Sequence, residues 1–222
     1  MTTRVNLGKS NLTPNFIGAW EMEPSICDQI ITYYDKNQEK QRQGSTASGT
    51  INLDTKNRKD ISLTPQDLNL QGNELFNEYF ETLFKCYKDY NNQWSFLASI
   101  FPKLEIGRFN IGRYIAGQHF QEVHTERANL GSLHRLLAFM TYLNDVEDGG
   151  STYFNHYDLD IKPTKGLTLI WPAEWTHSHK GNVLKTGVKY IITGWLTFPP
   201  KNLQSPSTSV KPVDIPEISL SY

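Results

Sequence analysis

A histidine and a carboxylate lie two positions apart near the middle of the chain, at His124 and Glu126. In an extended strand, residues i and i+2 point to the same face, so this imidazole and this carboxylate can bind one ion together. A metal site would need a third ligand from elsewhere in the chain. Without one, the pair is typical of an ordinary strand edge whose polar side chains face water.

Two histidines in a later segment, 175–179, are candidates for that third ligand. His177 and His179 alternate onto the same side of a strand, so the spacing within the segment does not separate them. Lys189 follows ten positions after His179, in a strand-like run. Two histidines and one carboxylate on one face of an octahedron leave the opposite face free for a chelating cosubstrate and dioxygen, as in non-haem Fe(II) oxygenases. The residue types therefore indicate an iron site with an acid-binding lysine beside it.

Segment 114–195 holds these groups in a distinctive order. The motifs are Tyr114 nine residues before His124-x-Glu126, then Tyr142-Leu143-Asn144, Gly149-Gly150-x-Thr152, His179-x-Gly181, Lys189 and Trp195. In order and spacing they resemble the Fe(II)- and 2-oxoglutarate-dependent dioxygenases, and within these the prolyl 4-hydroxylase-like branch. One position departs from that pattern, because the family usually has Asp where this chain has Glu126.

The resemblance implies a set of metal ligands. His124, Glu126 and His179 would hold the iron. The H-x-G pattern and the count back from Lys189 select His179 over His177, which would then lie beside the ligands or face the substrate.

The resemblance also implies a pocket for the cosubstrate. Lys189 would pair with the distal carboxylate of 2-oxoglutarate, helped by the hydroxyl of Tyr142, and Tyr114 would line the same pocket. A lysine suits this role because a desolvated carboxylate needs a compensating charge and a hydrogen bond at once.

Further residues are candidates for the rim where a substrate would bind. These are Arg127, Trp175, His177 and Arg58. Arg58 belongs to a run of four polar residues, 57–60, which is either a solvated turn or part of that rim. The polar segment 39–60 is expected near the mouth of the site, and for Trp195 we expect packing in the core.

The resemblance implies hydroxylation of a proline in a peptide or protein, of the procollagen-proline type. Fe(II), 2-oxoglutarate and dioxygen would be required, with ascorbate as the reductant. Two alternatives stay open: the same oxygenase chemistry on a free amino acid or other small molecule, and a non-catalytic binding module on the same fold.

Length and charge bound these possibilities. With 222 residues, the chain fits a single dioxygenase domain over 1–222, with core motifs in 104–198 and a Pro/Ser-rich tail at 199–222. A net charge of −1 gives no basic excess for nucleic acid. No apolar run near about 18 residues and no signal peptide are apparent, so we expect no membrane association. We expect a cytoplasmic protein, either bacterial or viral and acting in a host cytoplasm; the oligomeric state stays open.

The hydrophobic periodicity predicts the elements that must position these residues. Period-2 runs predict strands, and i, i+3, i+4 runs predict helices with buried Cys27 and Cys86. The expected strands or extended segments are 15–20, 50–63, 104–115, 136–143, 167–171 and 189–198. The expected helices are 25–38 and 65–91, and residues 69–73, which include Gly72, are a candidate break in the second helix. The fold class expected is α+β, mainly β: a jelly-roll or cupin-like double-stranded β-helix with N-terminal helices packed outside.

Overall fold

Two antiparallel sheets form the framework. The computed structural model describes residues 3–7, 15–46, 50–101 and 103–199. The large sheet has the order β1 (Thr3–Arg4), β2 (Gly18–Glu21), β11 (Leu167–Pro172), β8 (Arg135–Tyr142), β13 (Val188–Thr197), β6 (Glu105–Ile115), β5 (Lys59–Leu63), β3 (Arg42–Gln43). The small sheet has the order β10 (Leu159–Ile161), β9 (Thr152–Phe154), β12 (His179–Gly181), β7 (His119–His124), β4 (Lys56–Asn57).

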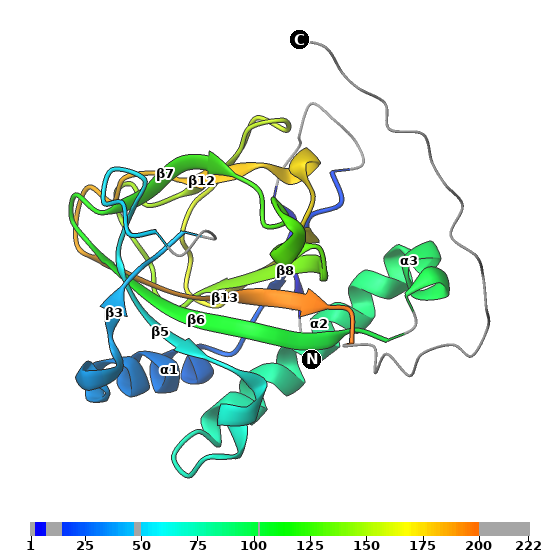
Figure 1. The fold of residues 1–222 in the computed structure, drawn as a ribbon, viewed down its shortest axis with the longest axis horizontal. Helices are drawn as coiled ribbons and strands as arrows, with labels where there is room; N and C mark the ends of the chain where they lie inside the picture. Colours follow the sequence, from blue (N-terminus) through cyan, green and yellow to red (C-terminus); the bar gives the residue numbers. More distant parts are fainter. Residues whose placement is uncertain (1–2, 8–14, 47–49, 102, 200–222) are drawn as a thin grey trace, which may run out of the picture.

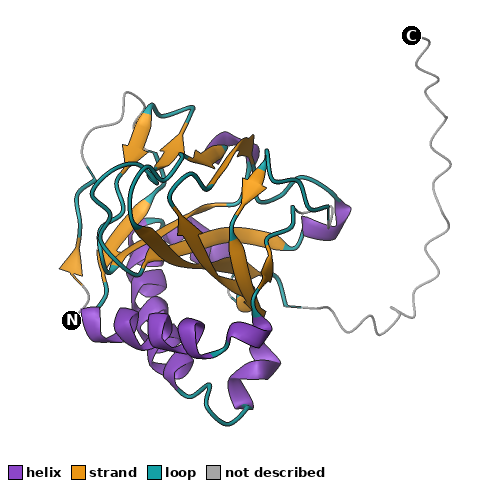
Figure 2. Cartoon of the chain, turned by 90° about the vertical axis from the view of Figure 1, so that its left-hand side faces the viewer, coloured by secondary structure: helices purple, strands orange, loops and turns teal. Residues whose placement is uncertain are grey.

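The elements stack in three layers. In Figure 1 the small sheet, with β7 and β12, lies above the large sheet, with β6 and β13, and the helices α1 and α2 lie below. Figure 2 shows the helices gathered on one side of the strands. The helices are α1 (Pro24–Lys36), α2 (Leu75–Gln93) and the short α3 (Ser95–Ile100). The predicted double-stranded β-helix with helices outside is therefore confirmed.

Strand β13 shows why the large sheet has two different faces. Successive side chains of a strand point to opposite sides. Ile192 and Leu196 belong to the apolar cluster between the large sheet and the helices. Lys189, Thr193 and Trp195 line a cavity on the other side of the sheet. The sheet thus separates the apolar cluster beside the helices from a second apolar cluster, into which the polar cavity is set.

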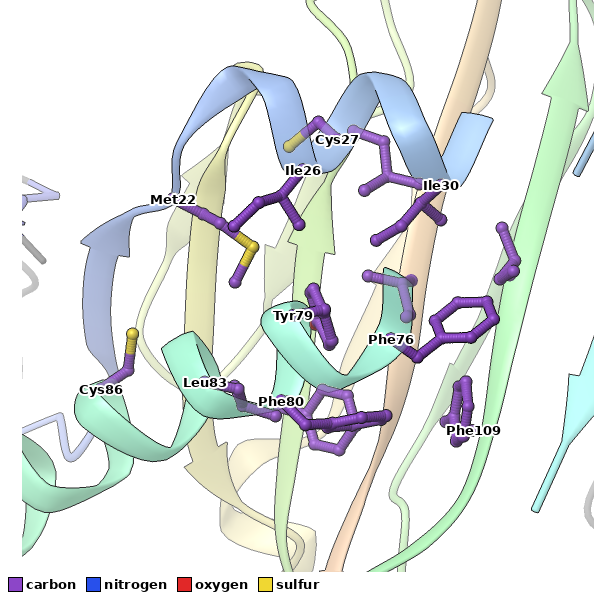
Figure 3. Close-up of a cluster of buried hydrophobic side chains, with 14 of the residues drawn as sticks. Met22, Ile26, Cys27, Ile30, Phe76, Tyr79, Phe80, Leu83, Cys86 and Phe109 are labelled. Atoms are coloured by element: carbon purple, nitrogen blue, oxygen red, sulfur yellow. The ribbon is translucent and has the colours of Figure 1, made fainter. Parts of the chain in front are cut away.

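The hydrophobic layer is rich in aromatic rings (Figure 3). Phe109 of β6 packs edge-on against Phe76 and Phe80 of α2, with ring centroids 5.5 and 4.9 Å apart. Gly194 of β13 makes room for these rings, because a Cβ there would lie 2.6 Å from Phe139 and 2.8 Å from Phe109. Edge-to-face contacts of this kind add to the stability gained from burial.

The helix boundaries follow local signals. Pro24 lies in the first turn of α1, where its missing N–H costs no hydrogen bond. The expected helix 65–91 is divided, because Gly72 has a positive φ of 89° between the 3₁₀ helix η2 (Pro65–Asn69) and α2. This break agrees with the prediction, whereas α3 was not predicted.

The two cysteines lie in the helical layer, as expected. Cys27 of α1 and Cys86 of α2 are both free and fully buried. Burial raises the pKa of the Cys27 thiol to about 11 and that of Cys86 to about 12. Both therefore stay protonated at neutral pH.

Segment 50–63 differs from the single extended stretch that we expected. Its strands β4 and β5 belong to different sheets, and Arg58 joins them. The predicted tail 199–222 lies outside the described residues apart from Pro199. Within the described part of the chain, no helix is both long and apolar enough to cross a membrane.

Candidate active site

The three candidate metal ligands meet between the sheets. His124 ends β7, His179 begins β12, and the two are direct partners across these paired strands. Glu126 lies two residues beyond the end of β7, so strand alternation alone does not place it. One donor atom from each residue lies within 4.8 Å of the others. The carboxylate Oε1 of Glu126 is 3.4 Å from Nε2 of His179 and 3.9 Å from Nε2 of His124.

Both imidazoles are oriented through their second nitrogen. Nδ1 of His124 lies 2.9 Å from the carbonyl of Glu122, and Nδ1 of His179 lies 2.9 Å from that of His177. A carbonyl only accepts, so Nδ1 donates, and in the neutral ring Nε2 keeps a free lone pair. Burial, and then the neighbouring His179, lower the pKa of His124 to about 4. This donor set fits an iron(II) ion.

Glu126 is held through its other oxygen. The indole N–H of Trp195 donates to Oε2 at 2.8 Å, which leaves Oε1 facing the histidines. Arg135 donates to the backbone carbonyl of Glu126 at 2.9 Å and stacks 3.6 Å above the Trp195 ring. Burial raises the pKa of Glu126, but His179, His124 and the Trp195 N–H together hold it well below its usual range. Trp195 thus packs against an apolar cluster, as expected, and also lines the cavity.

Lys189 lies farther along the same cavity and is almost completely buried. Its Nζ donates to the carbonyl of Gly150 at 2.6 Å and lies 4.1 Å from the centre of the Tyr114 ring. Among the described residues, no carboxylate lies within ion-pair distance of this ammonium group. Burial, and then the charge of Arg58, lower its pKa to about 7. A buried ammonium without a counter-ion is costly, so this part of the cavity fits an anion.

Arg58 is not on the rim, and segment 57–60 is not a solvated turn. The guanidinium is buried in the cavity wall, where it forms an ion pair with Asp60, Nε to Oδ1, at 2.7 Å. It also donates to the hydroxyl of Tyr114 at 2.7 Å. Asp60 has a second cation, because Lys56 Nζ lies 3.2 Å from its Oδ2. The segment is therefore not a solvated turn, and Arg58 lies in the inner wall of the cavity.

Tyr142 does not face the cavity as expected. Its hydroxyl donates toward Oγ1 of Thr152 at 2.6 Å, with the carbonyl of Ile161 at 3.2 Å. Thr152 lines the cavity, whereas Tyr142 lies behind it. Tyr114, which does line the cavity, is the tyrosine beside Lys189.

The remaining rim candidates do not line the cavity either. His177 is buried and turned away, with Nε2 at 2.9 Å from the carbonyl of Asn15. Arg127 forms an ion pair with Glu174. Trp175 is 66% exposed. The side chains of these three residues do not line the cavity, although the backbone carbonyl of His177 orients the ring of His179. His179 is the histidine of segment 175–179 whose side chain lies beside Glu126.

Comparisons with known proteins agree with this arrangement. Residues 109–197 match the family model described as the 2OG-Fe(II) oxygenase superfamily. The curated protein Probable prolyl 4-hydroxylase 9 of Arabidopsis thaliana is 29% identical over 125 residues, which cover 45% of this chain. The match spans only 43% of that relative.

Two solved structures share the fold. A prolyl-4-hydroxylase of Pseudomonas putida has a TM-score of 0.64 at 14% identity, over 86% of this chain and 96% of that one. A prolyl hydroxylase of Trichoplax adhaerens, in complex with a hypoxia inducible factor oxygen degradation domain peptide fragment, has a TM-score of 0.64 at 17% identity. That likeness covers 84% of this chain and 85% of the other. Residues 109–197 thus match the 2OG-Fe(II) oxygenase superfamily, and the chain shares the fold of these two prolyl hydroxylases.

Proposed function

We propose that this protein is an Fe(II)- and 2-oxoglutarate-dependent oxygenase that hydroxylates a proline residue in a peptide or protein. The observation that carries the proposal is the proximity of two histidines and a glutamate in a cavity that also holds a buried, unneutralised lysine. The superfamily implies Fe(II), 2-oxoglutarate and dioxygen.

In this proposal, His124, Glu126 and His179 hold the iron. Iron with 2-oxoglutarate and dioxygen supplies the oxidation of a C–H bond to C–OH, with succinate and carbon dioxide as coproducts. The carbonyls behind both imidazoles fix their orientation, and Trp195 directs the free carboxylate oxygen toward them. Lys189 binds the distal carboxylate of the cosubstrate, because that buried cation needs an anion.

The substrate class rests on the relatives. The curated relative is described as a prolyl 4-hydroxylase, and the Trichoplax enzyme was solved with a peptide fragment. We infer that this chain also accepts a proline-containing peptide, outside the small acid pocket. Ascorbate as the reductant, the single-domain organisation over 1–222 and the cytoplasmic compartment stay predictions.

Succinate formation tests the proposal. The protein is incubated with Fe(II), 2-oxoglutarate and ascorbate, with and without proline-rich peptides, and mass spectrometry reads hydroxylation of the peptide. We expect peptide to stimulate succinate release and to gain one oxygen on proline. His179→Ala should abolish both signals, whereas the matched change His177→Ala should keep them in protein of unchanged far-UV circular dichroism.

Other outcomes would overturn parts of the proposal. Succinate release without stimulation by any peptide would keep the oxygenase and exclude a peptidyl proline. Folded, iron-loaded protein that forms no succinate would favour a binding module. Loss of activity in His177→Ala alone would reassign the third ligand.

A further inference from the structure

Arg58 is a buried cation in the wall of the cavity that holds Tyr114 and Lys189. Its side chain is 5% exposed and lies between Asp60 and Tyr114. The Nε group of Arg58 forms the ion pair with Asp60, and Nη1 donates a hydrogen bond to the Tyr114 hydroxyl. Because Asp60 also binds Lys56, the guanidinium is fixed from one side by a carboxylate that is itself held in place. Arg58 thus lines the cavity itself and also holds the Tyr114 hydroxyl from one side.

The contact with Arg58 determines which way the Tyr114 hydroxyl points. A guanidinium has donors only, so the phenolic oxygen must act as the acceptor. Burial raises the pKa of Tyr114, and the hydroxyl thus keeps its proton at neutral pH. No acceptor for this proton is found among the described residues, and the proton must point away from Arg58. Tyr142 differs, because its proton already has acceptors in Thr152 and Ile161.

The nearest charged group on the cavity side of Tyr114 is Lys189. Its ammonium lies over the Tyr114 ring, 4.1 Å from the ring centre, and makes one hydrogen bond, to Gly150, out of the three that it can donate. The Lys189 ammonium and the ring that carries the Tyr114 hydroxyl thus lie side by side in one cavity, and each group can donate a further hydrogen bond. A carboxylate has two acceptor oxygens and a negative charge, which match this pair of donors.

The charges of the cluster also require an anion. When Lys189 is protonated, Arg58, Lys56 and Lys189 carry three positive charges, and the carboxylate paired with this cluster is that of Asp60. Asp60 is already shared between Arg58 and Lys56, so it does not compensate Lys189.

We propose that Arg58 is a positioning residue for the cosubstrate: it holds the Tyr114 oxygen as an acceptor, so that the Tyr114 proton and Lys189 together bind the distal carboxylate of 2-oxoglutarate. This inference rests on the proposed function. It assigns to Tyr114, oriented by Arg58, the hydroxyl contact that the family pattern predicts for Tyr142.

A double-mutant cycle tests this role. Calorimetry measures the Kd of 2-oxoglutarate for the protein loaded with Mn(II), which replaces iron without turnover. The variants are Tyr114→Phe, Arg58→Gln and the double change. Each single change should weaken binding about tenfold or more, the usual effect of losing a hydrogen bond to a charged group. The double change should weaken it no further than Tyr114→Phe alone, because Arg58 acts through the hydroxyl.

Matched controls separate this role from a general loss of positive charge or of structure. Arg108→Gln, an exposed arginine on the same strand as Tyr114, should leave Kd unchanged. Arg58→Lys keeps a donor and a charge and should bind 2-oxoglutarate more tightly than Arg58→Gln. If Arg58→Gln does not fold, Arg58→Lys with and without Tyr114→Phe gives the same cycle. In the oxygenase assay, Arg58→Gln should raise KM for 2-oxoglutarate while kcat at saturation stays near that of the native chain.

The outcomes distinguish the two proposals. If the native Mn(II) protein does not bind 2-oxoglutarate, the proposed function fails. If the native protein binds it and Arg58→Gln binds equally well, the positioning role fails while the oxygenase stands. Losses that multiply in the double variant would also overturn that role, because they would show that Arg58 acts independently of the Tyr114 hydroxyl.

Discussion

The two faces of strand β13 differ in what they require. On the helix side, Ile192 and Leu196 pack into a continuous apolar cluster. On the cavity side, Lys189 and Trp195 present donors to groups that the fold only partly supplies. Apolar packing is complete within the chain, whereas a buried charge is compensated only when its partner is present. One strand can therefore stabilise the fold through alternate residues and form part of a binding site through the others.

The same comparison predicts different consequences for mutations on the two faces. Removing a side chain from the helix side leaves a cavity in a packed interior, which lowers the free energy of unfolding. Removing a polar side chain from the opposite side takes away a group that is costly to bury, so the main loss should appear in binding.

Phe109→Ala should have the largest effect, a loss of about 3–5 kcal/mol in the free energy of unfolding. Phe109 is fully buried and packs edge-on against two aromatic rings of α2. Urea unfolding followed by circular dichroism measures the loss. Phe96→Ala, at a side chain that is 74% exposed, is the matched control and should change stability by less than about 0.5 kcal/mol. Equal losses in the two variants would contradict the packing of the helical layer.

Lys189→Met should cost about 2–5 kcal/mol in the binding free energy of 2-oxoglutarate, because the distal carboxylate would be buried without its cation. In contrast to Phe109→Ala, it should leave the free energy of unfolding unchanged or higher, since it removes a buried charge that has no carboxylate partner. Calorimetry and urea unfolding on the same samples measure both quantities. A large loss of stability with native affinity would reverse the roles of the two faces.

The pH dependence of binding sharpens the Lys189 prediction. The pKa of Lys189 in the free protein is about 7, below its ordinary value, because of burial and then Arg58. A carboxylate binds the ammonium form, so affinity should be constant well below pH 7 and fall as pH rises through it, by up to about tenfold per unit. Lys189→Met should bind weakly at every pH and lack this fall. An affinity that rises above pH 7 in the native protein would contradict the assignment.

Trp195→Phe should have a smaller effect, a reduction of about 10–100-fold in metal affinity, which is typical for the loss of a partner that orients a ligand. The change keeps an aromatic ring under Arg135 but replaces the larger indole by a phenyl ring, and so removes the N–H that holds Oε2 of Glu126. Titration with Mn(II), followed by electron paramagnetic resonance, measures the affinity. Trp175→Phe, at an exposed tryptophan, is the control. Native affinity in Trp195→Phe would show that Glu126 needs no support from the indole.

Much of this arrangement could be predicted from sequence because the key residues fall in short motifs. The β-helix and its outer helices followed from hydrophobic periodicity. The proximity of His124, Glu126 and His179 agrees with the spacing of their motifs. Gly72 marked the break between η2 and α2.

The missed features depend on contacts between distant segments. Arg58 was expected on a rim because four consecutive polar residues usually face water, yet its partner Tyr114 lies 56 positions later in the chain. The sequence did contain a signal for this contact. Lys56, Arg58 and Asp60 lie at alternate positions, as residues on one face of a strand do. The same rule places Trp195 on the face of Lys189, six residues earlier, and so at the cavity as well as against the apolar cluster.

The position of the two thiols has a chemical consequence. Enzymes that activate dioxygen can oxidise their own side chains, and thiolates are among the most readily oxidised of these. In this chain both cysteines lie among the helices, on the far side of the large sheet from the candidate iron site, and their raised pKa values keep them as thiols. The large sheet thus lies between the oxidisable sulfur atoms of Cys27 and Cys86 and any reactive species that escapes the cavity.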